Sequence, residues 1–442
     1  MPPSDSLLLD QAQQILMSNR QAGGYTIPCQ GLYPFQWNWD SGFIALGYAH
    51  FNIEAAVSEI KTLLDAQWSN GFIPHIVFQQ PSDTYFPGPD FQRADLSPYA
   101  HPKFSSSGIT QPPVLGFVLE RIFNQAEAST LDYSLLEELA LKIFKNIVYF
   151  YQNRDPNDEG LAFIFHNWES GTDNSPVWDD VWKTMDVPKY KVQRKDTTHV
   201  NPELRPTQRE YDHYLYLIDL AKECGYVEEE IFKRSPLLIQ DPLFNSMLLA
   251  SNAALRRIFK SLGKHPEKIS YLEEKYQLGK TSMDQKLYAP DQGAYVYFDL
   301  RNNKQLSYIS SSSYTPLMAG IPSPERALIL VKSLQQRFAN EHYLCASFDP
   351  THPLFHPKKY WRGPVWINLN WILYQGLKHY GFEDFAQRLK TDTLQLIQEA
   401  GFYEYFDPRK KLSPGQKRGY GGQNFSWTAA LFIDLLNDHA NP

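Results

Sequence analysis

Two carboxylic acids lie in short segments whose surroundings suit acid–base chemistry. Asp173 stands in the turn-forming segment Gly-Thr-Asp-Asn-Ser-Pro at 171–176, and Glu404 has aromatic neighbours in the segment Tyr-Glu-Tyr-Phe at 403–406. Hydrolysis of a glycosidic bond uses two carboxyl groups on opposite sides of a sugar, one to protonate the leaving oxygen and one to activate water. Burial beside apolar rings keeps such an acid protonated near neutral pH. Asp173 could equally cap its own turn, so spacing alone leaves both interpretations open.

Aromatic residues alternate with polar ones in two further segments. The first is Tyr-Pro-Phe-Gln-Trp-Asn-Trp-Asp-Ser-Gly-Phe at 33–43, and the second is Tyr-Trp-Arg-Gly-Pro-Val-Trp at 360–366. Aromatic residues make up 14% of the chain, so rings are available beyond these segments as well. Rings beside carboxylates and amides suit a sugar, which has apolar C–H faces and hydroxyl groups that need hydrogen bonds. Core packing is the commoner role for any single ring, so only the whole pattern favours a sugar site.

Other polar residues near these segments have more ordinary interpretations. Glu169 is the strongest rival for the acid role. No His-Glu-x-x-His or comparable ligand spacing is present, so we expect no catalytic metal. We interpret His75, His166 and His199 as structural or substrate-contacting groups. Acids expected to lie on the surface or to bond within loops are Glu169, Asp179, Asp180 and Asp407.

Two groups of basic residues stand apart from the acids. One cluster consists of Lys189, Lys191, Arg194 and Lys195. We interpret it as a mobile solvated loop; the less favoured alternative is a lid that closes over an anionic sugar derivative. The segment 409–418, Arg-Lys-Lys-Leu-Ser-Pro-Gly-Gln-Lys-Arg, carries five cations. It could attract an anionic group of the substrate, but a solvated surface loop is the interpretation we favour.

Helical periodicity recurs along the whole chain and predicts an all-α protein. Strand-like runs are short, at 161–166 and 293–300, and are expected to form hairpins in loops. No fixed-period repeat supports a stacked solenoid, so paired helices in a ring fit better. Long irregular stretches near 78–106 and 165–205 are expected over one mouth of such a ring. Helices are predicted after a Ser4 cap and near 53–64, 108–124, 134–152, 207–224, 242–262, 266–278, 323–337, 366–380, 383–399 and 425–438.

Composition and charge exclude several classes of protein. The net charge is −7, which argues against a general nucleic-acid binder. The three cysteines, Cys29, Cys224 and Cys345, are far apart and odd in number, so they predict neither a disulfide framework nor a zinc motif and favour a reducing cytoplasm. No signal peptide or membrane-spanning run is visible. A small glycoside is the expected partner, nucleic acid and membranes are not, and a homo-oligomer is left open.

The motifs together resemble glycoside hydrolase family sixty-three. The segments Glu-Ser-Gly-Thr-Asp-Asn-Ser-Pro at 169–176, Tyr-Trp-Arg-Gly-Pro-Val-Trp at 360–366, and Glu-Tyr-Phe-Asp-Pro at 404–408 with Asn-Phe-Ser-Trp-Thr-Ala-Ala-Leu at 424–431 are similar to those of its small bacterial and plant branch, the mannosylglycerate and glucosylglycerate hydrolases. The resemblance covers nearly the full length in the same order and extends distantly to the inverting trehalases. It implies one (α/α)6 barrel domain over 1–442 that acts by inversion without a cofactor on a small α-glucoside or α-mannoside.

The same resemblance implies roles for individual residues. Asp173 corresponds to the general acid and Glu404 to the general base. Arg205 would grip a carboxylate of the aglycone, the non-sugar part, with two parallel hydrogen bonds. The segment 409–418 is longer and more basic than is typical of the family. Implied sugar-pocket residues are Tyr33, Trp37, Trp39, Asp40, Gln111, Trp168, Gly171, Trp361 and Trp366, and implied aglycone residues are Arg205, Tyr211, Tyr360 and Gln423.

Three alternatives remain at this stage. A hydrolase of a neutral disaccharide, of the α-glucosidase or trehalase type, would need no cation for the aglycone. A non-catalytic carbohydrate-binding protein would keep the rings, but would have no need for two opposed acids. Sugar epimerases also use helical barrels, but they resemble a pattern with paired catalytic histidines that we do not find.

Overall fold

Six helices form a closed inner ring in the computed structural model, which describes residues 5–126, 132–198 and 200–438. Each inner helix packs against the next along the chain, and the last packs against the first, so that the ring closes. In order, the inner helices are α2 (Asn38–Tyr48), α5 (Leu115–Gln125), α10 (Pro242–Leu262), the 3-10 helix η6 (Ser311–Leu317), α13 (Ile367–His379) and α15 (Ser426–Asn437).

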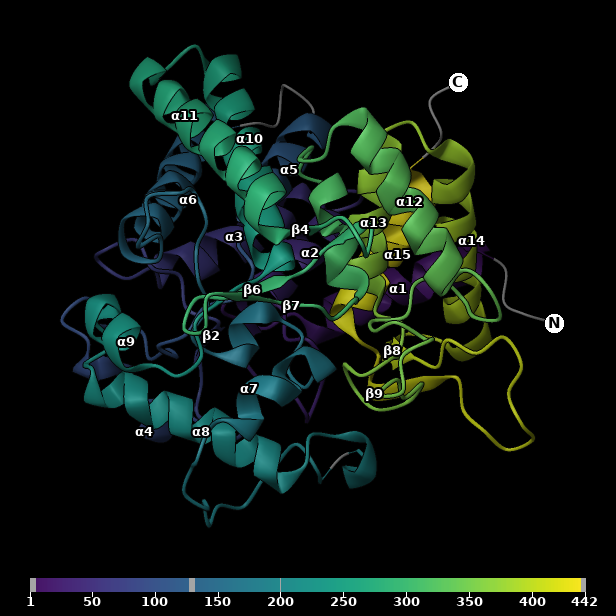
Figure 1. Cartoon of the computed structure of the whole chain (residues 1–442). Helices are drawn as coiled ribbons and strands as arrows, with labels where there is room; N and C mark the ends of the chain where they lie inside the picture. The colour runs from purple at the N-terminus through teal and green to yellow at the C-terminus, as the bar shows by residue number, and fades with distance from the viewer. Residues whose placement is uncertain (1–4, 127–131, 199, 439–442) are drawn as a thin grey trace.

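A second set of helices surrounds this ring, and inner and outer helices alternate along the sequence (Figure 1). Each outer helix packs on one or two inner ones. This arrangement is an (α/α)6 barrel, and the predicted fold class is confirmed. The outer helices are α1 (Asp5–Asn19), α3 (Ile53–Asp65), α6 (Tyr133–Asn153), α11 (Pro266–Ser282), α12 (Pro324–Phe338) and α14 (Glu383–Ala400).

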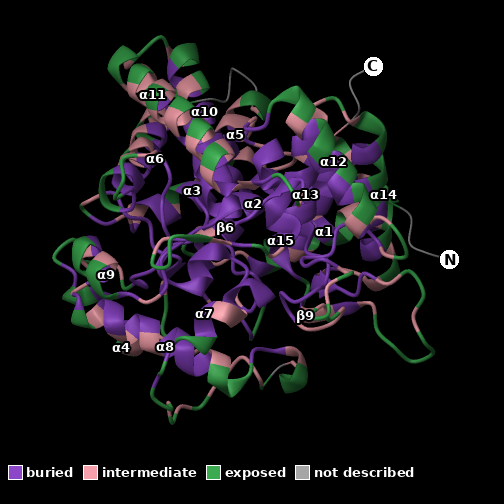
Figure 2. Ribbon diagram, viewed as in Figure 1, coloured by how far each residue is buried: buried purple, intermediate pink, exposed green. Residues whose placement is uncertain are grey.

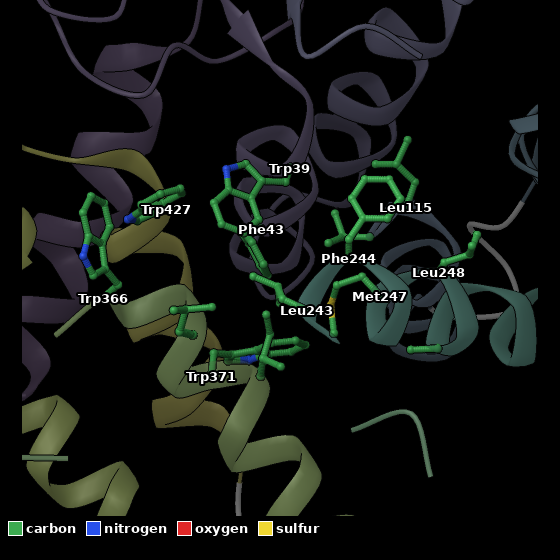
Figure 3. Packing of buried hydrophobic residues seen from close by; sticks show 14 of the residues in the cluster. Trp39, Phe43, Leu115, Leu243, Phe244, Met247, Leu248, Trp366, Trp371 and Trp427 are labelled. Carbon is green, nitrogen blue, oxygen red and sulfur yellow. The ribbon is translucent and has the colours of Figure 1, made fainter. Parts of the chain in front are cut away.

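Burial separates the two rings. Every residue of α2 and η6 is buried, whereas the outer helices show an exposed face and a buried one (Figure 2). A helix that is apolar on all sides belongs inside a protein, and an amphipathic one at its surface. In the core, Trp39 and Phe43 from α2 lie near Trp371 from α13 and Trp427 from α15 (Figure 3). A Cβ added at Gly47 of α2 would overlap the backbone of Ala430 in α15, so a glycine is needed where the ring closes.

Most predicted helices agree with the structure to within a few residues, but two expectations were wrong. The helix expected from 108 begins at Leu115, because the prolines at 112 and 113 hold the preceding chain extended. No helix was predicted over 38–48, where the structure has α2. Since α2 is buried on all sides, it shows no apolar stripe for a periodicity search to find. The predicted Ser4 cap lies outside the described residues.

The described strands are short antiparallel pairs at the loops, and they form no closed sheet. The predicted run 293–300 forms β5 and β6 in two hairpins, whereas in the run 161–166 only Ile164 makes a bridge, to Ile239. The pairs are β1 (Gln36–Trp37) with β2 (Ile76–Val77), β4 (Tyr288–Ala289) with β5 (Ala294–Tyr295), and β8 (Tyr403–Phe406) with β9 (Gly419–Gln423); β6 (Tyr297–Asp299) lies between β3 (Ile239–Gln240) and β7 (Lys304–Leu306).

The two long insertions carry short helices and lie beside the barrel helices, toward the bottom of Figure 1. No helix in the described part of the chain is long and apolar enough to cross a membrane. The region 78–106 holds α4 (Pro89–Gln92) and η1 (Ala94–Leu96), and 165–205 holds η2 (Asn167–Ser170), η3 (Pro176–Trp178), α7 (Asp179–Lys183) and η4 (Pro202–Leu204). The remaining helices are α8 (Gln208–Glu223), α9 (Glu228–Arg234) and the π-helical turn η5 (Met283–Leu287).

Candidate active site

A pocket of about 820 Å³, counted with its open mouth, lies where inner helices begin. Trp39 and Asp40 come from the first turn of α2, Trp366 precedes α13 directly, and Trp427 lies in the first turn of α15. Helix N-termini carry partial positive charge, so this end of the ring suits anionic groups.

The structure brings almost all the predicted site residues to this one pocket. Both acids line it, together with every residue that was implied for the sugar. The tight turn at Gly171, where φ is +72°, passes against the Trp39 ring, so a Cβ there would overlap the indole. The predicted residues that line the pocket are Tyr33, Trp37, Trp39, Asp40, Gln111, Trp168, Gly171, Asp173, Arg205, Tyr211, Tyr360, Trp361, Trp366 and Glu404.

Gln423 is the exception, and its placement at the aglycone is corrected. Its side chain is exposed and donates a hydrogen bond to the Tyr403 hydroxyl at 3.0 Å, away from the pocket. Gly422, one residue earlier on β9, donates its N–H to Glu404. Gln423 pairs with Tyr403 in the strand register and shares its face. Because Tyr403 and Glu404 are successive residues that point to opposite faces, Gln423 lies on the face away from Glu404.

Sequence reasoning missed several residues of the pocket wall. Asp196 was not singled out among the cations around it, and Tyr85 belongs to a stretch that was treated only as an insertion. Trp427 was quoted in a motif without a role. His75 had been left between a structural and a contact role, and it lines the pocket with its ring stacked on Trp168 at a centroid distance of 6.1 Å. The lining residues not predicted for the site are Pro28, Leu32, His75, Tyr85, Phe86, Asp196, Pro206, Tyr214, Phe425 and Trp427.

Two hydrogen bonds hold the Glu404 carboxylate. The Tyr33 hydroxyl donates to Oε1 at 2.8 Å, and the Gly422 N–H donates to Oε2 at 2.9 Å. Burial raises the pKa of Glu404, and the Arg205 guanidinium, the Gly422 N–H and the Tyr33 hydroxyl oppose that rise. Gly421 has a φ of +75° and lies against Glu404. A Cβ at Gly421 would overlap Oε2 of Glu404. The loop therefore holds this carboxylate in one position with two donors aimed at it.

Asp173 lies in a different environment. Burial raises its pKa to about 7, with Arg205 opposing the rise and Glu404 adding to it. Its backbone carbonyl accepts hydrogen bonds from the Asn167 amide at 2.8 Å and the Tyr214 hydroxyl at 3.3 Å, which fixes the turn. Asp173 can thus keep a proton near neutral pH.

A third carboxyl group, Asp40, stands at the N-terminus of α2. Burial and the nearby Glu404 raise its pKa well above the usual range. Beside it, the Gln111 Oε1 accepts the Trp39 N–H at 3.2 Å, which leaves the amide nitrogen of Gln111 to be used elsewhere. These two polar groups lie among rings and can bind hydroxyl groups.

Aromatic rings form much of the pocket wall. Trp361 and Trp366 stack with their centroids 3.6 Å apart and nearly parallel, and Trp366 stacks on Tyr405 at 4.9 Å. Trp39 meets Trp427 edge to face at 5.6 Å. Such a wall offers flat apolar surface to the C–H faces of a sugar while the carboxyl groups reach its hydroxyls.

Arg205 is the only Arg or Lys among the described residues that line the pocket. Its Nη2 donates to the Tyr33 hydroxyl at 3.2 Å, its Nε to Asp196 at 3.4 Å, and its guanidinium lies 3.9 Å from the centroid of the Tyr360 ring. Nη1 is 3.9 Å from Glu404 and has no hydrogen-bond partner. Nη1 has both hydrogens unused and Nη2 has one left, so a two-point contact with a carboxylate is available.

The rival acids have other partners. Glu169 is fully buried and forms an ion pair with Arg154, and it also accepts the N–H groups of Thr110 and Phe165. Asp179 pairs with Arg362 at 2.7 Å. Asp180 accepts from Lys183 and Tyr308, and Asp407 pairs with Arg409. None of the four lines the pocket, in agreement with the ordinary interpretation.

The histidine and cation predictions have mixed outcomes. His166 is structural, because its Nδ1 accepts the Trp168 N–H at the start of η2. His199 lies outside the described residues. Lys189 and Lys191 are exposed, but Arg194 is not solvated: its side chain is 9% exposed and pairs with Asp196 at 2.6 Å.

The basic segment 409–418 joins β8 to β9. Arg409 pairs with Asp407, and Arg418 pairs with Glu399 at 2.9 Å. Lys410, Lys411 and Lys417 are exposed. None of these cations lines the pocket, which supports the surface-loop interpretation.

Comparison with known sequences relates the whole chain to sugar hydrolases. Residues 33–428 match the family described as the mannosylglycerate hydrolase MGH1-like glycoside hydrolase domain. The mannosylglycerate hydrolase of Rubrobacter radiotolerans is 38% identical over 439 residues, which cover 97% of this chain and 96% of that protein. The glucosylglycerate hydrolase of Mycolicibacterium hassiacum is 33% identical over 95% of this chain and 96% of its own length.

Solved structures show the same relation. The crystal structure of the family 63 mannosylglycerate hydrolase from Thermus thermophilus, in complex with Tris and D-glycerate, has a TM-score of 0.89 and 37% identity, covering 97% of this chain and 100% of that one. The neutral trehalase Nth1 from Saccharomyces cerevisiae has a TM-score of 0.60 and 17% identity, covering 94% and 74% of the two chains. The trehalase likeness shows a shared fold.

We predict that Glu169→Ala destabilises the protein by about 3–5 kcal/mol, because it breaks a buried ion pair and leaves Arg154 with only Glu228, 3.6 Å away, as an acidic partner. Urea unfolding measures this loss. Asp180→Asn, which changes an acid whose side chain is 44% exposed, is the control and should stay close to wild type. A Glu169→Ala protein that unfolds like wild type but has lost its activity would contradict the structural role.

Proposed function

The chain belongs to the family of mannosylglycerate hydrolase MGH1-like glycoside hydrolases, and on this premise we propose that it cleaves a small α-linked glucoside or mannoside of glycerate with inversion. Asp173 is the general acid and Glu404 is the general base. The observation that carries the proposal is that these two carboxyl groups line one pocket in unlike surroundings.

The two environments suit opposite protonation states. Burial favours the protonated form of Asp173, whose pKa is raised to about 7. Glu404 receives hydrogen bonds from the Tyr33 hydroxyl and the Gly422 N–H, and such donors favour the ionised form of a carboxyl group. An acid that holds its proton and a base that has lost it are the two groups that an inverting hydrolase needs.

The reaction follows from this assignment. Glu404 removes a proton from a water molecule as the water oxygen attacks the anomeric carbon of the sugar. The bond from that carbon to the glycosidic oxygen breaks, and Asp173 transfers its proton to that oxygen. Afterwards Glu404 is protonated and Asp173 is ionised, and one proton passes through solvent to restore both groups. The new hydroxyl group lies on the opposite face of the sugar ring from the one that was lost.

The aglycone is proposed from the charge of the pocket. Arg205 has unused N–H groups and little exposure, with 5% of its side chain accessible. A guanidinium in such a place binds a carboxylate with two charge-assisted hydrogen bonds, which a neutral aglycone cannot form. Glycerate supplies that carboxylate, and Tyr211 and Tyr360, which also line the pocket, complete the aglycone end.

The same reasoning extends to the chain as a whole. The pocket takes residues from Pro28 to Trp427, which supports one catalytic domain over 1–442. The three cysteines are unpaired and buried, which supports the proposed cytoplasmic location because disulfides form mainly in oxidising compartments.

We predict that Asp173→Asn and Glu404→Gln each lower kcat by about 100- to 10,000-fold while leaving thermal unfolding near that of wild type. Proton NMR of mannosylglycerate and glucosylglycerate hydrolysis identifies both the sugar and the first anomer formed. Inversion gives the β-anomer of the free sugar from an α-linked substrate. Initial release of the α-anomer would contradict inversion, and binding without hydrolysis would favour a carbohydrate-binding protein.

The dependence of kcat/KM on pH tests the two roles. Asp173 must be protonated to act, so the rate should fall as the pH rises through about 7. Glu404 must be ionised, so the rate should also fall as the pH drops below its pKa. A glycosyl fluoride, whose leaving group needs no proton, should lose the alkaline limb and keep the acidic one. An unchanged alkaline limb with the fluoride would remove Asp173 from the acid role.

Arg205 should determine the preference for an anionic aglycone. Arg205→Ala is expected to lower kcat/KM for the glycerate glycoside by about 10- to 150-fold, with a much smaller loss for the glycerol glycoside. Arg205→Lys keeps the charge but loses the planar fork, so it should restore only part of the activity. Equal losses on both substrates would show that Arg205 acts on the fold or on Glu404 instead.

A further inference from the structure

The orientation of Arg205 decides which of its nitrogens can meet a substrate. Its Nε contacts Asp196 at 3.4 Å, whereas Nη1 is buried without a hydrogen-bond partner and lies 3.9 Å from Glu404. A guanidinium without that contact would bring Nη1 closer to Glu404 than 3.9 Å and into a hydrogen bond, because opposite charges in a buried site attract strongly. A contact on the Nε side is therefore what keeps the opposite edge of the guanidinium available.

Asp196 is held firmly enough to provide that contact. Arg194 grips it with two hydrogen bonds, from Nε at 3.0 Å and from Nη2 at 2.6 Å, and its side chain is 14% exposed. Burial would raise the pKa of Asp196, but the hydrogen bonds and charges of Arg194 and Arg205 outweigh it, and the pKa lies below the usual value. Asp196 thus remains a carboxylate between two guanidinium groups.

Arg194 is itself fixed by the wall of the pocket. Its guanidinium lies 4.3 Å from the centroid of the Tyr211 ring, and Nη1 donates to the Pro206 carbonyl at 2.7 Å. Tyr211 in turn donates its hydroxyl to the Phe86 carbonyl at 2.8 Å. Asp196 is one carboxylate shared between two guanidinium groups, so it orients Arg205 without neutralising both cations.

We propose that Asp196, clamped by Arg194, is a positioning residue that holds Arg205 by its Nε, so that Nη1 stays 3.9 Å from Glu404 with N–H groups unpaired, and so determines the preference for a carboxylate aglycone. This inference rests on the proposed function. Asp196 acts through Arg205, because without its anchor Arg205 loses its fixed direction and the carboxylate loses a preformed partner.

The test uses Asp196→Asn, which removes the charge with little change of shape. For the glycerate glycoside, KM should rise roughly 10-fold or more, because the loss of one hydrogen bond to a charged group has about that effect on binding. The value of kcat should change much less. The inhibition constant of D-glycerate should rise in parallel, and that of the free sugar should not change. Asp196→Glu, which keeps the charge, should recover part of the affinity, and Asp180→Asn on α7 should behave as wild type.

Each outcome decides between the alternatives. Equal changes in the inhibition constants of D-glycerate and the free sugar, or no change in either, would show that Asp196 only supports the fold, and would overturn the inference alone. If Asp196→Asn is not folded at the assay temperature, Arg194→Lys, which keeps the charge but loses the two-point grip on Asp196, is judged by the same constants. A wild-type protein that neither cleaves glycerate glycosides nor binds D-glycerate would overturn the proposed function and the inference together.

Discussion

Closure of the inner ring between α2 and α15 is the contact on which the pocket depends. The two helices come from opposite ends of the chain and approach closely at Gly47 and Ala430. The Ser426 hydroxyl donates to the Ile27 carbonyl at 2.7 Å, and the Asn19 amide donates to that hydroxyl at 2.9 Å. Through this junction the Tyr33 hydroxyl reaches Glu404, 371 residues away in the sequence. An open ring would leave the proposed base without one of its two donors.

Parallel inner helices explain why one end of the barrel does the chemistry. Inner and outer helices alternate, so each inner helix runs in the same direction and begins at the same end. Residues at the starts of α2, α13 and α15 therefore converge on the pocket, and residues in the middle of these helices form the core (Figure 3). The loops that precede inner helices supply the rest of the pocket wall, as loops on a rigid scaffold often do in enzymes.

Charge in the pocket is unbalanced in a way that suits an acid and a base. Asp40 and Glu404 are buried and Asp173 is half-buried, and Arg205 carries the one guanidinium among the described residues that line the same pocket. Burial is the main cause that raises the pKa of all three acids, and the charge of Glu404 adds to the rise at Asp40 and Asp173. The hydrogen bonds from Tyr33 and Gly422 favour the ionised form of Glu404, which suits its role as the base in the proposed reaction.

The sequence alone determined the chemistry-bearing segments and the fold class. Short stretches of sequence were sufficient for both predictions. Periodic apolar stripes mark the outer helices, and the motifs around Asp173 and Glu404 are contiguous. Tertiary structure alone decided which residues in those segments face the substrate. Gln423 lies one residue from the Glu404 donor Gly422, yet its strand pairing with Tyr403 places it on the face away from Glu404. The buried helix α2 carries no stripe, and Asp196 took its place in the pocket only through contacts with Arg194 and Arg205. These assignments depend on contacts between residues that are far apart in the sequence, and no local sequence pattern encodes those contacts.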